Sequence, residues 1–153
     1  MAIGVAATVS SPLSERAKGI EVFSAVPIFK GFGEEELKAI VNLSKKQSFK
    51  PGETIVREGE AGLGFYVIVE GRASVKKKGR IVAKLGRGGF FGEMALFDDM
   101  PRSADVVADE PTECLVLLRW NFWSLVTKNK KMVQELFREM ARRLRATDEA
   151  LKE

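Results

Sequence analysis

The spacing of apolar and polar positions changes along the chain and separates an N-terminal helical region from the rest. The stretch VFSAVPIFKGFGEEELKAIVNLS, residues 22–44, has helical spacing at both ends and an interruption at Pro27 and at residues 31–33. Three glutamates follow Gly33, which predicts a helix start because the helix dipole favours acids in the first turn. The expected buried stripe of this helix consists of Leu37, Ile40 and Val41.

The region from about residue 44 to residue 119 has the short apolar runs and frequent turn signals of β structure. Seven runs predict strands: Gln47 to Phe49, Thr54 to Val56, Phe65 to Val69, Ala73 to Lys77, Ile81 to Leu85, Ser103 to Val107 and Glu113 to Leu118. The glycine-containing segments KPGE, VEGR, KKGR and LGRGGF predict turns between them. A doubly wound α/β sheet would need helices between the strands. We therefore expect a mainly β fold with flanking helices, in which a β-roll (a jelly-roll-like antiparallel sandwich) covers about residues 44–119.

Two C-terminal helices are expected after the roll, a short one over Trp120 to Lys128 and a longer one from Lys130 to about Leu151. The longer helix carries a seam with spacings of four and three, formed by Val133, Phe137, Met140, Leu144, Thr147 and Leu151. The whole seam can pack on the roll. Self-association of its last half is an equally open alternative, because a roll cannot cover a helix about 30 Å long.

The length of 153 residues suits one domain, which we assign to residues 19–153. Residues 1–18 lack the basic segment of a secretory signal and are expected to form a flexible N-terminal tail. No window has the 18 or more apolar residues that a membrane helix needs. With one cysteine and no sign of an oxidising compartment, the sequence favours a cytoplasmic protein without membrane insertion.

Composition argues against catalysis. The chain has no histidine, and Cys114 is its only cysteine, which excludes His-based zinc sites, His-dependent triads and an internal disulfide. The P-loop, GxGxxG and GxSxG motifs are also absent from the sequence. We therefore expect a binding protein that is not an enzyme and holds no metal.

The net charge of +4 comes from 25 basic and 21 acidic residues, with clusters at Lys76-Lys77-Lys78 and over residues 138–145. A nucleic-acid or membrane surface is one interpretation of such clusters. Solvated faces of a hairpin and of a helix are the simpler interpretation.

The stretch FGEMALFDDMPRSADVVA, residues 91–108, contains the strongest candidate chemistry. Gly92 to Leu96 suits a single helical turn, whose free N–H groups can hold an anion. Arg102 adds a planar fork suited to two phosphate oxygens, and Ser103 adds a hydroxyl. A phosphate would repel the carboxylate of Glu93, which suits a sugar hydroxyl instead. This combination describes a nucleotide pocket. The alternative is a Glu93–Arg102 ion pair inside the roll, and an isolated buried pair rarely adds net stability.

The same stretch resembles the phosphate-binding cassette of the cyclic nucleotide-binding domain family, F-G-E-[LI]-[AG]-L followed by a short polar turn and P-R-[AST]-A. KPGETIVREGEAGLGFYVIVEGRASV resembles the first half of that family's roll, and the likeness covers about residues 20–150. The ligand contacts that it implies are Gly92, Glu93, Met94, Ala95, Arg102, Ser103 and Ala104. Glu93 would bind the ribose 2′-hydroxyl and Arg102 the exocyclic phosphate oxygens. Ser103 would assist at the phosphate or base, and Val82 would line the base pocket.

The segment EMARRLRATDEA resembles the long helix of the catabolite-activator type of bacterial regulator. This resemblance implies that Arg143 and Thr147 reach the ligand, with Thr147 at the adenine amino group, within one chain or across a homodimer. Asp148 stands where that subfamily has a small hydroxyl residue, so a second base contact is not implied. In those regulators a DNA-binding domain follows this helix, and none is seen before the chain stops at Glu153.

The resemblance implies a stand-alone sensor that reversibly binds a 3′,5′-cyclic mononucleotide, with cAMP favoured over cGMP. Movement of the C-terminal helices would pass the signal to an effector protein. Two alternatives stay open: a degenerate roll that works as a protein-interaction module, and the regulatory fragment of a larger enzyme, channel or transcription regulator.

Overall fold

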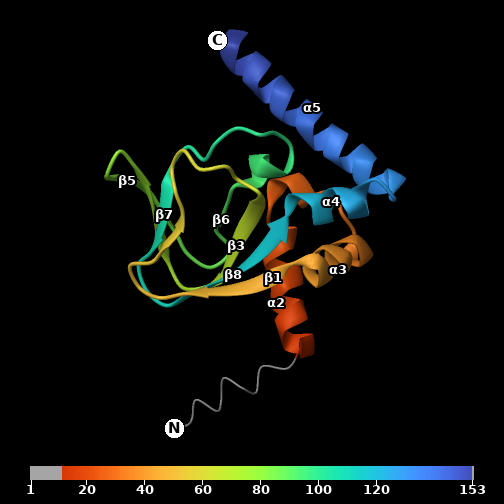
Figure 1. Cartoon of the computed structure of the whole chain (residues 1–153). Coiled ribbons are helices and arrows are strands. Elements are labelled where there is room, and N and C mark those ends of the chain that lie inside the picture. The colour runs from red at the N-terminus through yellow and green to blue at the C-terminus, as the bar shows by residue number, and fades with distance from the viewer. Residues whose placement is uncertain (1–11, 153) are drawn as a thin grey trace.

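Two four-stranded antiparallel sheets form the centre of residues 12–152, the part of the chain that this computed structural model describes (Figure 1). The strand orders are β1-β8-β3-β6 and β2-β7-β4-β5. The strands are β1 Lys45–Phe49, β2 Thr54–Val56, β3 Gly64–Glu70, β4 Ala73–Lys77, β5 Arg80–Leu85, β6 Phe90–Phe91, β7 Asp105–Ala108 and β8 Thr112–Leu118. The helical elements are α2 Pro12–Ser24, η1 Pro27–Phe29, α3 Glu34–Leu43, η2 Glu93–Leu96, α4 Arg119–Val126 and α5 Lys130–Lys152. The mainly β fold with flanking helices is confirmed.

The alternation pattern located the strands but not all of their ends. All seven predicted runs form strands, and β2 and β4 have the predicted bounds. Ser103 lies instead in a bend before β7. At that point the Arg102 N–H donates to the Glu60 carbonyl at 2.9 Å, and the Gly59 N–H donates to the Arg102 carbonyl at 2.8 Å. The pattern does not predict β6, because two residues are too short to show an alternation.

Helix α2 begins at Pro12, so the expectation of a flexible tail over residues 1–18 is wrong for residues 12–18. Two side chains of this segment reach the roll. Glu15 pairs with Lys46 at 3.2 Å, and Lys18 pairs with Glu70 at 3.3 Å. Residues 1–11 lie outside the described part of the chain.

Strand β3 is buried on both faces and separates two cores, which is why its sequence is almost continuously apolar. The side chains that it directs towards the helices are Phe65, Val67 and Val69. Tyr66 and Ile68 point into the roll, where Ile68 meets Cys114. Burial raises the pKa of the Cys114 thiol to about 12, so this cysteine behaves as an apolar core residue.

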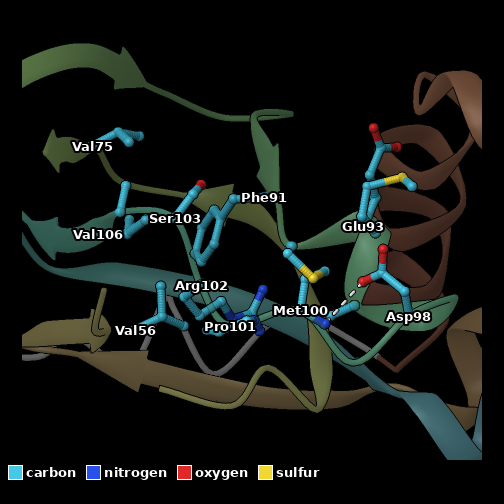
Figure 2. A pocket seen from close by; sticks show the side chains of 14 residues that line it. Val56, Val75, Phe91, Glu93, Asp98, Met100, Pro101, Arg102, Ser103 and Val106 are labelled. Atoms are coloured by element: carbon cyan, nitrogen blue, oxygen red, sulfur yellow. Dashed lines mark hydrogen bonds between the residues drawn. The ribbon is translucent and has the colours of Figure 1, made fainter. Parts of the chain in front are cut away.

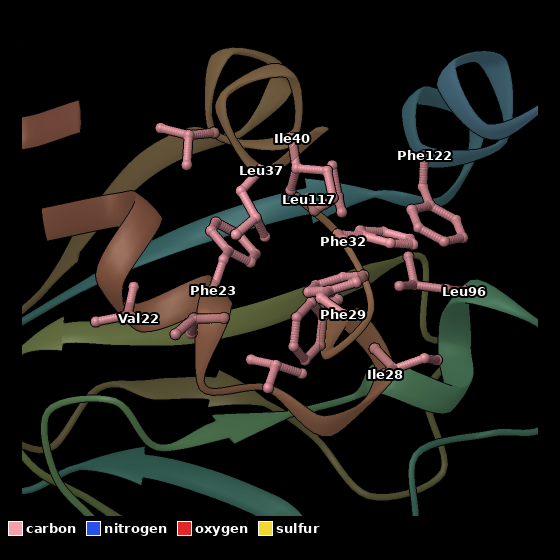
Figure 3. Packing of buried hydrophobic residues seen from close by; sticks show 14 of the residues in the cluster. Val22, Phe23, Ile28, Phe29, Phe32, Leu37, Ile40, Leu96, Leu117 and Phe122 are labelled. Atoms are coloured by element: carbon pink, nitrogen blue, oxygen red, sulfur yellow. The ribbon is translucent and has the colours of Figure 1, made fainter. Parts of the chain in front are cut away.

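Phe29 joins the helices at both ends of the chain to the roll (Figure 3). It is 1% exposed. The ring centroids of Phe23, Phe32, Phe65 and Phe122 lie 5.8, 5.4, 5.7 and 6.1 Å from its own. These rings come from α2, the segment before α3, β3 and α4. The predicted stripe of α3 enters the same core, since Leu37, Ile40 and Val41 are buried.

Helix α5 packs on the body at its start and then extends away from it (Figure 1). Val133 and Met140 of the predicted seam contact the core, beside the buried Met132 and Leu136. The apolar seam residues that stay exposed are Phe137 (73%), Leu144 (72%) and Leu151 (81%). Packing of the whole seam on the roll is therefore wrong, and self-association of its last half stays a prediction. Among the described residues, no helix combines the length and apolar character needed to cross a bilayer.

Candidate functional site

A cavity of about 400 Å³ opens between η2 and the sheet that contains β2, β7 and β4 (Figure 2). This volume lies within the usual range of small-molecule sites, about 300–1,000 Å³. The lining residues are Val56, Val75, Phe91, Gly92, Glu93, Met94, Ala95, Asp98, Met100, Pro101, Arg102, Ser103, Ala104 and Val106. The structure thus brings together all seven residues of the predicted cassette.

The cavity has an apolar side and a polar side (Figure 2). Val56, Val75 and Val106 lie on one side, and Glu93 and Asp98 lie on the other. The three valines come from β2, β4 and β7. Sequence reasoning did not name them, although the alternation in these strands could have shown which of their residues point inward. Such a surface suits an amphipathic molecule with one flat apolar part and one charged part.

Arg102 enters the cavity from the segment before β7 and has only neutral partners among the described residues. Its Nη2 donates to the Gly64 carbonyl at 2.5 Å, and its Cζ lies 5.7 Å from the centroid of the Tyr66 ring. Burial lowers the pKa of the Arg102 guanidinium, and the nearby Tyr66 only partly opposes this effect. The alternative of a Glu93–Arg102 ion pair is wrong, because Glu93 pairs with Arg143. Within residues 12–152, a half-buried cation is therefore left without a counter-ion.

Tyr66 is a site residue that the sequence did not single out. Its ring stacks on Phe91 with centroids 5.0 Å apart and an interplanar angle of 7°. The other face of β3 is occupied by core residues, so the alternation along β3 turns Tyr66 towards the roll interior. The Tyr66 ring, held by Phe91, makes a cation–π contact with the Arg102 guanidinium.

The Arg102 side chain fits closely against two glycines, at positions where any other residue would place its Cβ. A Cβ added at Gly62 would lie 2.7 Å from Nε of Arg102, and a Cβ added at Gly92 would overlap Nη1. Gly92 also has φ +80°, in the left-handed region that side chains rarely adopt. It therefore both turns the chain into η2 and clears the position of the guanidinium.

Gly92→Ala is expected to lower the free energy of unfolding by about 2–4 kcal/mol, because left-handed strain adds to displacement of Arg102. Gly88 is the matched control, since it has φ +85° and no atom within 4 Å of an added Cβ. Gly88→Ala should cost only the backbone strain, about 1–2 kcal/mol. Urea denaturation of both variants measures the difference. Equal losses would contradict the proximity of Gly92 and Arg102.

Glu93 is paired with α5. Its Oε2 lies 3.3 Å from Nη2 of Arg143, and Nε of Arg143 lies 3.3 Å from Oε2 of Glu139. Burial lowers the pKa of Arg143, but hydrogen bonds and charge attraction from Glu93 and Glu139 outweigh it, so the net pKa is raised. Nη1 of Arg143 also lies 4.0 Å from Sδ of Met94. The predicted Arg143 therefore reaches the rim of the cavity without lining it.

Two other predicted residues lie away from the cavity. Thr147 is exposed, and its hydroxyl donates to the Arg143 carbonyl at 3.1 Å. Val82 is 54% exposed on β5. Neither is among the lining residues. In this structure Val75 lines the cavity from the strand that pairs with β5.

Comparison with known proteins places this geometry in a family. The sequence profile of the cyclic nucleotide-binding domain matches residues 46–129, which is more than half of the chain and includes the cassette. The chain belongs to the cyclic nucleotide-binding domain family. The resemblance drawn from the cassette is confirmed, and the domain is a regulatory fold.

Proteins with similar sequences include cyclic-nucleotide-dependent protein kinases and a cyclic AMP receptor protein. The domain is 41% identical over 103 residues to a cGMP-dependent protein kinase of Eimeria tenella, an alignment that covers 67% of this chain and 10% of the kinase. It is 32% identical over 127 residues to the cyclic AMP receptor protein of Thermus thermophilus, which covers 80% of this chain and 59% of the receptor protein. The chain therefore spans about a tenth of the first relative and about three fifths of the second.

Solved structures of other proteins have the same fold as this chain. The N-terminal domain of a transcriptional regulator from Streptomyces coelicolor superposes with a TM-score of 0.79 at 27% identity, covering 85% of this chain and 94% of that domain. The catabolite activator protein of Thermus thermophilus superposes with a TM-score of 0.67 at 32% identity, covering 83% of this chain and 62% of that protein.

Proposed function

We propose that the domain reversibly binds one 3′,5′-cyclic mononucleotide in the cavity, without turnover, and acts as a regulatory sensor. One observation carries this proposal: the half-buried guanidinium of Arg102 faces the cavity with no acidic partner among the described residues. An unpaired cation in a desolvated site gains most from an anionic ligand. A cyclic phosphate offers two exocyclic oxygens to the planar fork.

The remaining cassette residues fit the other parts of such a ligand. In the proposal Glu93 accepts the ribose 2′-hydroxyl, and Ser103 assists at the phosphate or base. The turn Gly92–Ala95 lies against the phosphate. The Ala95 N–H already donates to the Gly92 carbonyl at 3.0 Å, so it serves the phosphate only as a shared donor. Ala104 and the three valines of the apolar side provide a surface for the base.

The response involves α5. Oε2 of Glu93 lies 3.3 Å from Nη2 of Arg143 in α5. A ribose that binds Glu93 would therefore compete with this contact between Glu93 and the helix. A ligand shifts the position of α5 by as much as its affinities for the two arrangements differ. An effector protein, or a second copy joined through the exposed end of α5, would sense that shift. This scheme applies equally to a stand-alone sensor and to the regulatory part of a longer protein.

We propose cAMP as the preferred nucleotide. The support is the similarity to the cyclic AMP receptor protein over 80% of this chain, together with Thr147 in a helix of that type. In the present structure Thr147 lies outside the cavity, so a base contact by Thr147 would require α5 to move or a second chain to supply it. A cytoplasmic location remains part of the proposal, as the sequence suggests.

Calorimetric titration of the purified chain with cAMP and with cGMP, under identical conditions, tests the proposal. We expect saturation at one site per chain and tighter binding of cAMP. Tighter binding of cGMP would overturn the base preference alone. If a folded sample gave no heat with either nucleotide, and fluorescent analogues gave no binding, the protein-interaction module would replace the sensor.

A further inference from the structure

The positive charge of the chain is concentrated in one segment. Residues 71–92 contain seven basic side chains and no aspartate or glutamate. The other 131 residues contain 18 basic and all 21 acidic side chains, so they are slightly acidic. The segment spans β4, β5 and β6. The net charge of +4 therefore comes entirely from this part of the roll.

Four of these cations lie at the tip of the β4–β5 hairpin. Lys77 pairs with Arg80 across the hairpin, and the two residues between them form the turn. These residues, Lys78 and Gly79, have φ of +51° and +78°. Two successive left-handed residues are typical of the tight turns that match the twist of a hairpin. Together with Lys76, the tip presents four cations within five consecutive residues on a defined backbone.

The charges at the tip are not neutralised by the protein. Among the described residues, Lys76, Lys77, Lys78 and Arg80 form no ion pair, whereas Lys84 lies 3.7 Å from Asp109 further along β5. Asp105 is opposite Lys76 in the register of β4 and β7, but its Oδ1 accepts the Glu58 N–H at 2.6 Å. The described residues therefore leave the four positive charges of the tip available to an anionic partner outside the chain.

Two aliphatic side chains accompany the cations. Ile81 and Val82 follow the turn on β5 and are each 54% exposed. β5 is an edge strand, with β4 as its one neighbour in the sheet. Figure 1 places it on the side of the roll opposite α4 and α5. Helices of the described chain thus do not cover this surface.

We propose that the β4–β5 tip docks the protein on an anionic phospholipid surface, with Lys76–Lys78 and Arg80 at the headgroups and Ile81 and Val82 in the interfacial layer. Cations beside exposed aliphatic residues are the pattern of peripheral membrane binding. Charged side chains on an edge strand, here Arg80 and Lys84 of β5, discourage the addition of another strand, so a partner peptide is not expected to extend the sheet. Residues 73–85 contain no aromatic side chain, and single-stranded nucleic acids are usually held by aromatic stacking.

This docking is separate from nucleotide binding, because none of the four tip cations lines the cavity. A membrane-bound protein can therefore still take up its nucleotide. Failure of one proposal leaves the other standing.

Co-sedimentation of the full chain with lipid vesicles tests the docking. The probe is phosphatidylcholine vesicles with and without about 30% phosphatidylserine, at low salt and at about 0.5 M salt. We expect binding to the anionic vesicles at low salt, little binding to phosphatidylcholine alone, and loss of binding at high salt. Each basic residue near such a surface contributes about five-fold to the partition coefficient. Lys77→Glu combined with Lys78→Glu should therefore weaken binding by at least about 25-fold.

Lys128→Glu combined with Lys130→Glu is the matched control. Both lysines are exposed, form no ion pair among the described residues and give the same change in net charge. If the two double variants bind equally, net charge and not the hairpin is responsible, and the proposal is wrong. Equal binding to both vesicle types would also overturn it. Hairpin-dependent binding to duplex DNA without vesicle binding would replace the membrane by a nucleic acid.

Discussion

Arg102→Ala is expected to bind the cyclic nucleotide about 30-fold to several thousand-fold more weakly than the unchanged chain. Removing one member of a desolvated charge pair typically costs about 2–5 kcal/mol. Arg102 suits this estimate because it is half-buried and has a carbonyl and an aromatic ring as its partners. Calorimetry, or displacement of a fluorescent nucleotide, measures the change in affinity. A variant within a few-fold of the unchanged chain would remove Arg102 from the site.

Two companion variants separate charge from shape. Arg102→Lys keeps the positive charge but loses the planar fork, and we expect an intermediate loss of affinity. Arg145→Ala removes an exposed arginine of α5 that forms no ion pair among the described residues, and it should bind normally. Thermal unfolding of all three shows whether each is folded. A loss of binding shared by Arg145→Ala would point to net charge as the cause.

Phe29→Ala is expected to lower the free energy of unfolding by about 3–5 kcal/mol. Large-to-small substitutions of buried aromatic residues lose transfer free energy and leave a cavity that the neighbours fill only partly. Phe29 contacts four other rings from separate elements, so its neighbours have little freedom to collapse. A whole domain is stabilised by only about 5–15 kcal/mol, so the loss is a large fraction of the total. Urea denaturation measures it.

Phe137→Ala is the matched control, since the same atoms are removed from a side chain that is 73% exposed. Its cost in a monomer should be within about 0.5 kcal/mol. A larger cost that grows with protein concentration would instead show that the exposed seam of α5 pairs with a second copy. A loss below about 1 kcal/mol for Phe29→Ala would contradict the shared core.

The fold could be predicted largely because its strands are local patterns. Period-two alternation and glycine turns are readable in short windows, and seven strands were found in this way. The helical turn at η2 was found because Gly92 precedes an acid and a short apolar run. Two-residue β6 carries too few positions to show a period. The start of α2 does have a sequence signal, because Ser11 precedes Pro12 and Glu15 lies in the first turn, but the expectation of a flexible tail did not use it.

The cassette could be predicted as a contiguous motif, but its partners could not. Tyr66 contacts Arg102 from 36 residues earlier in the chain, and single-sequence patterns hold no information on such a pairing. Arg143 was expected near the ligand from the resemblance of its helix, but its contact with Glu93 was not. The exclusive pairing of Glu93 with Arg102 was a reasonable alternative by charge alone. The structure directs Glu93 to α5 instead, because η2 faces that helix across the cavity rim. Val82 was expected at the base pocket from the family resemblance, and the strand pattern alone does not indicate which sheet face meets the cavity.

In the proposed sensor, the contact between Glu93 and Arg143 links two properties of the response to nucleotide. One carboxylate both anchors α5 and, in the proposed complex, receives the ribose. A substitution that strengthens this contact lowers the activity without nucleotide. It also raises the nucleotide concentration needed for a response. A substitution that weakens this contact lowers the nucleotide concentration needed for a response, but it raises the activity without nucleotide. The sensitivity to nucleotide and the activity without nucleotide therefore depend on the same contact, and a substitution at this position changes both.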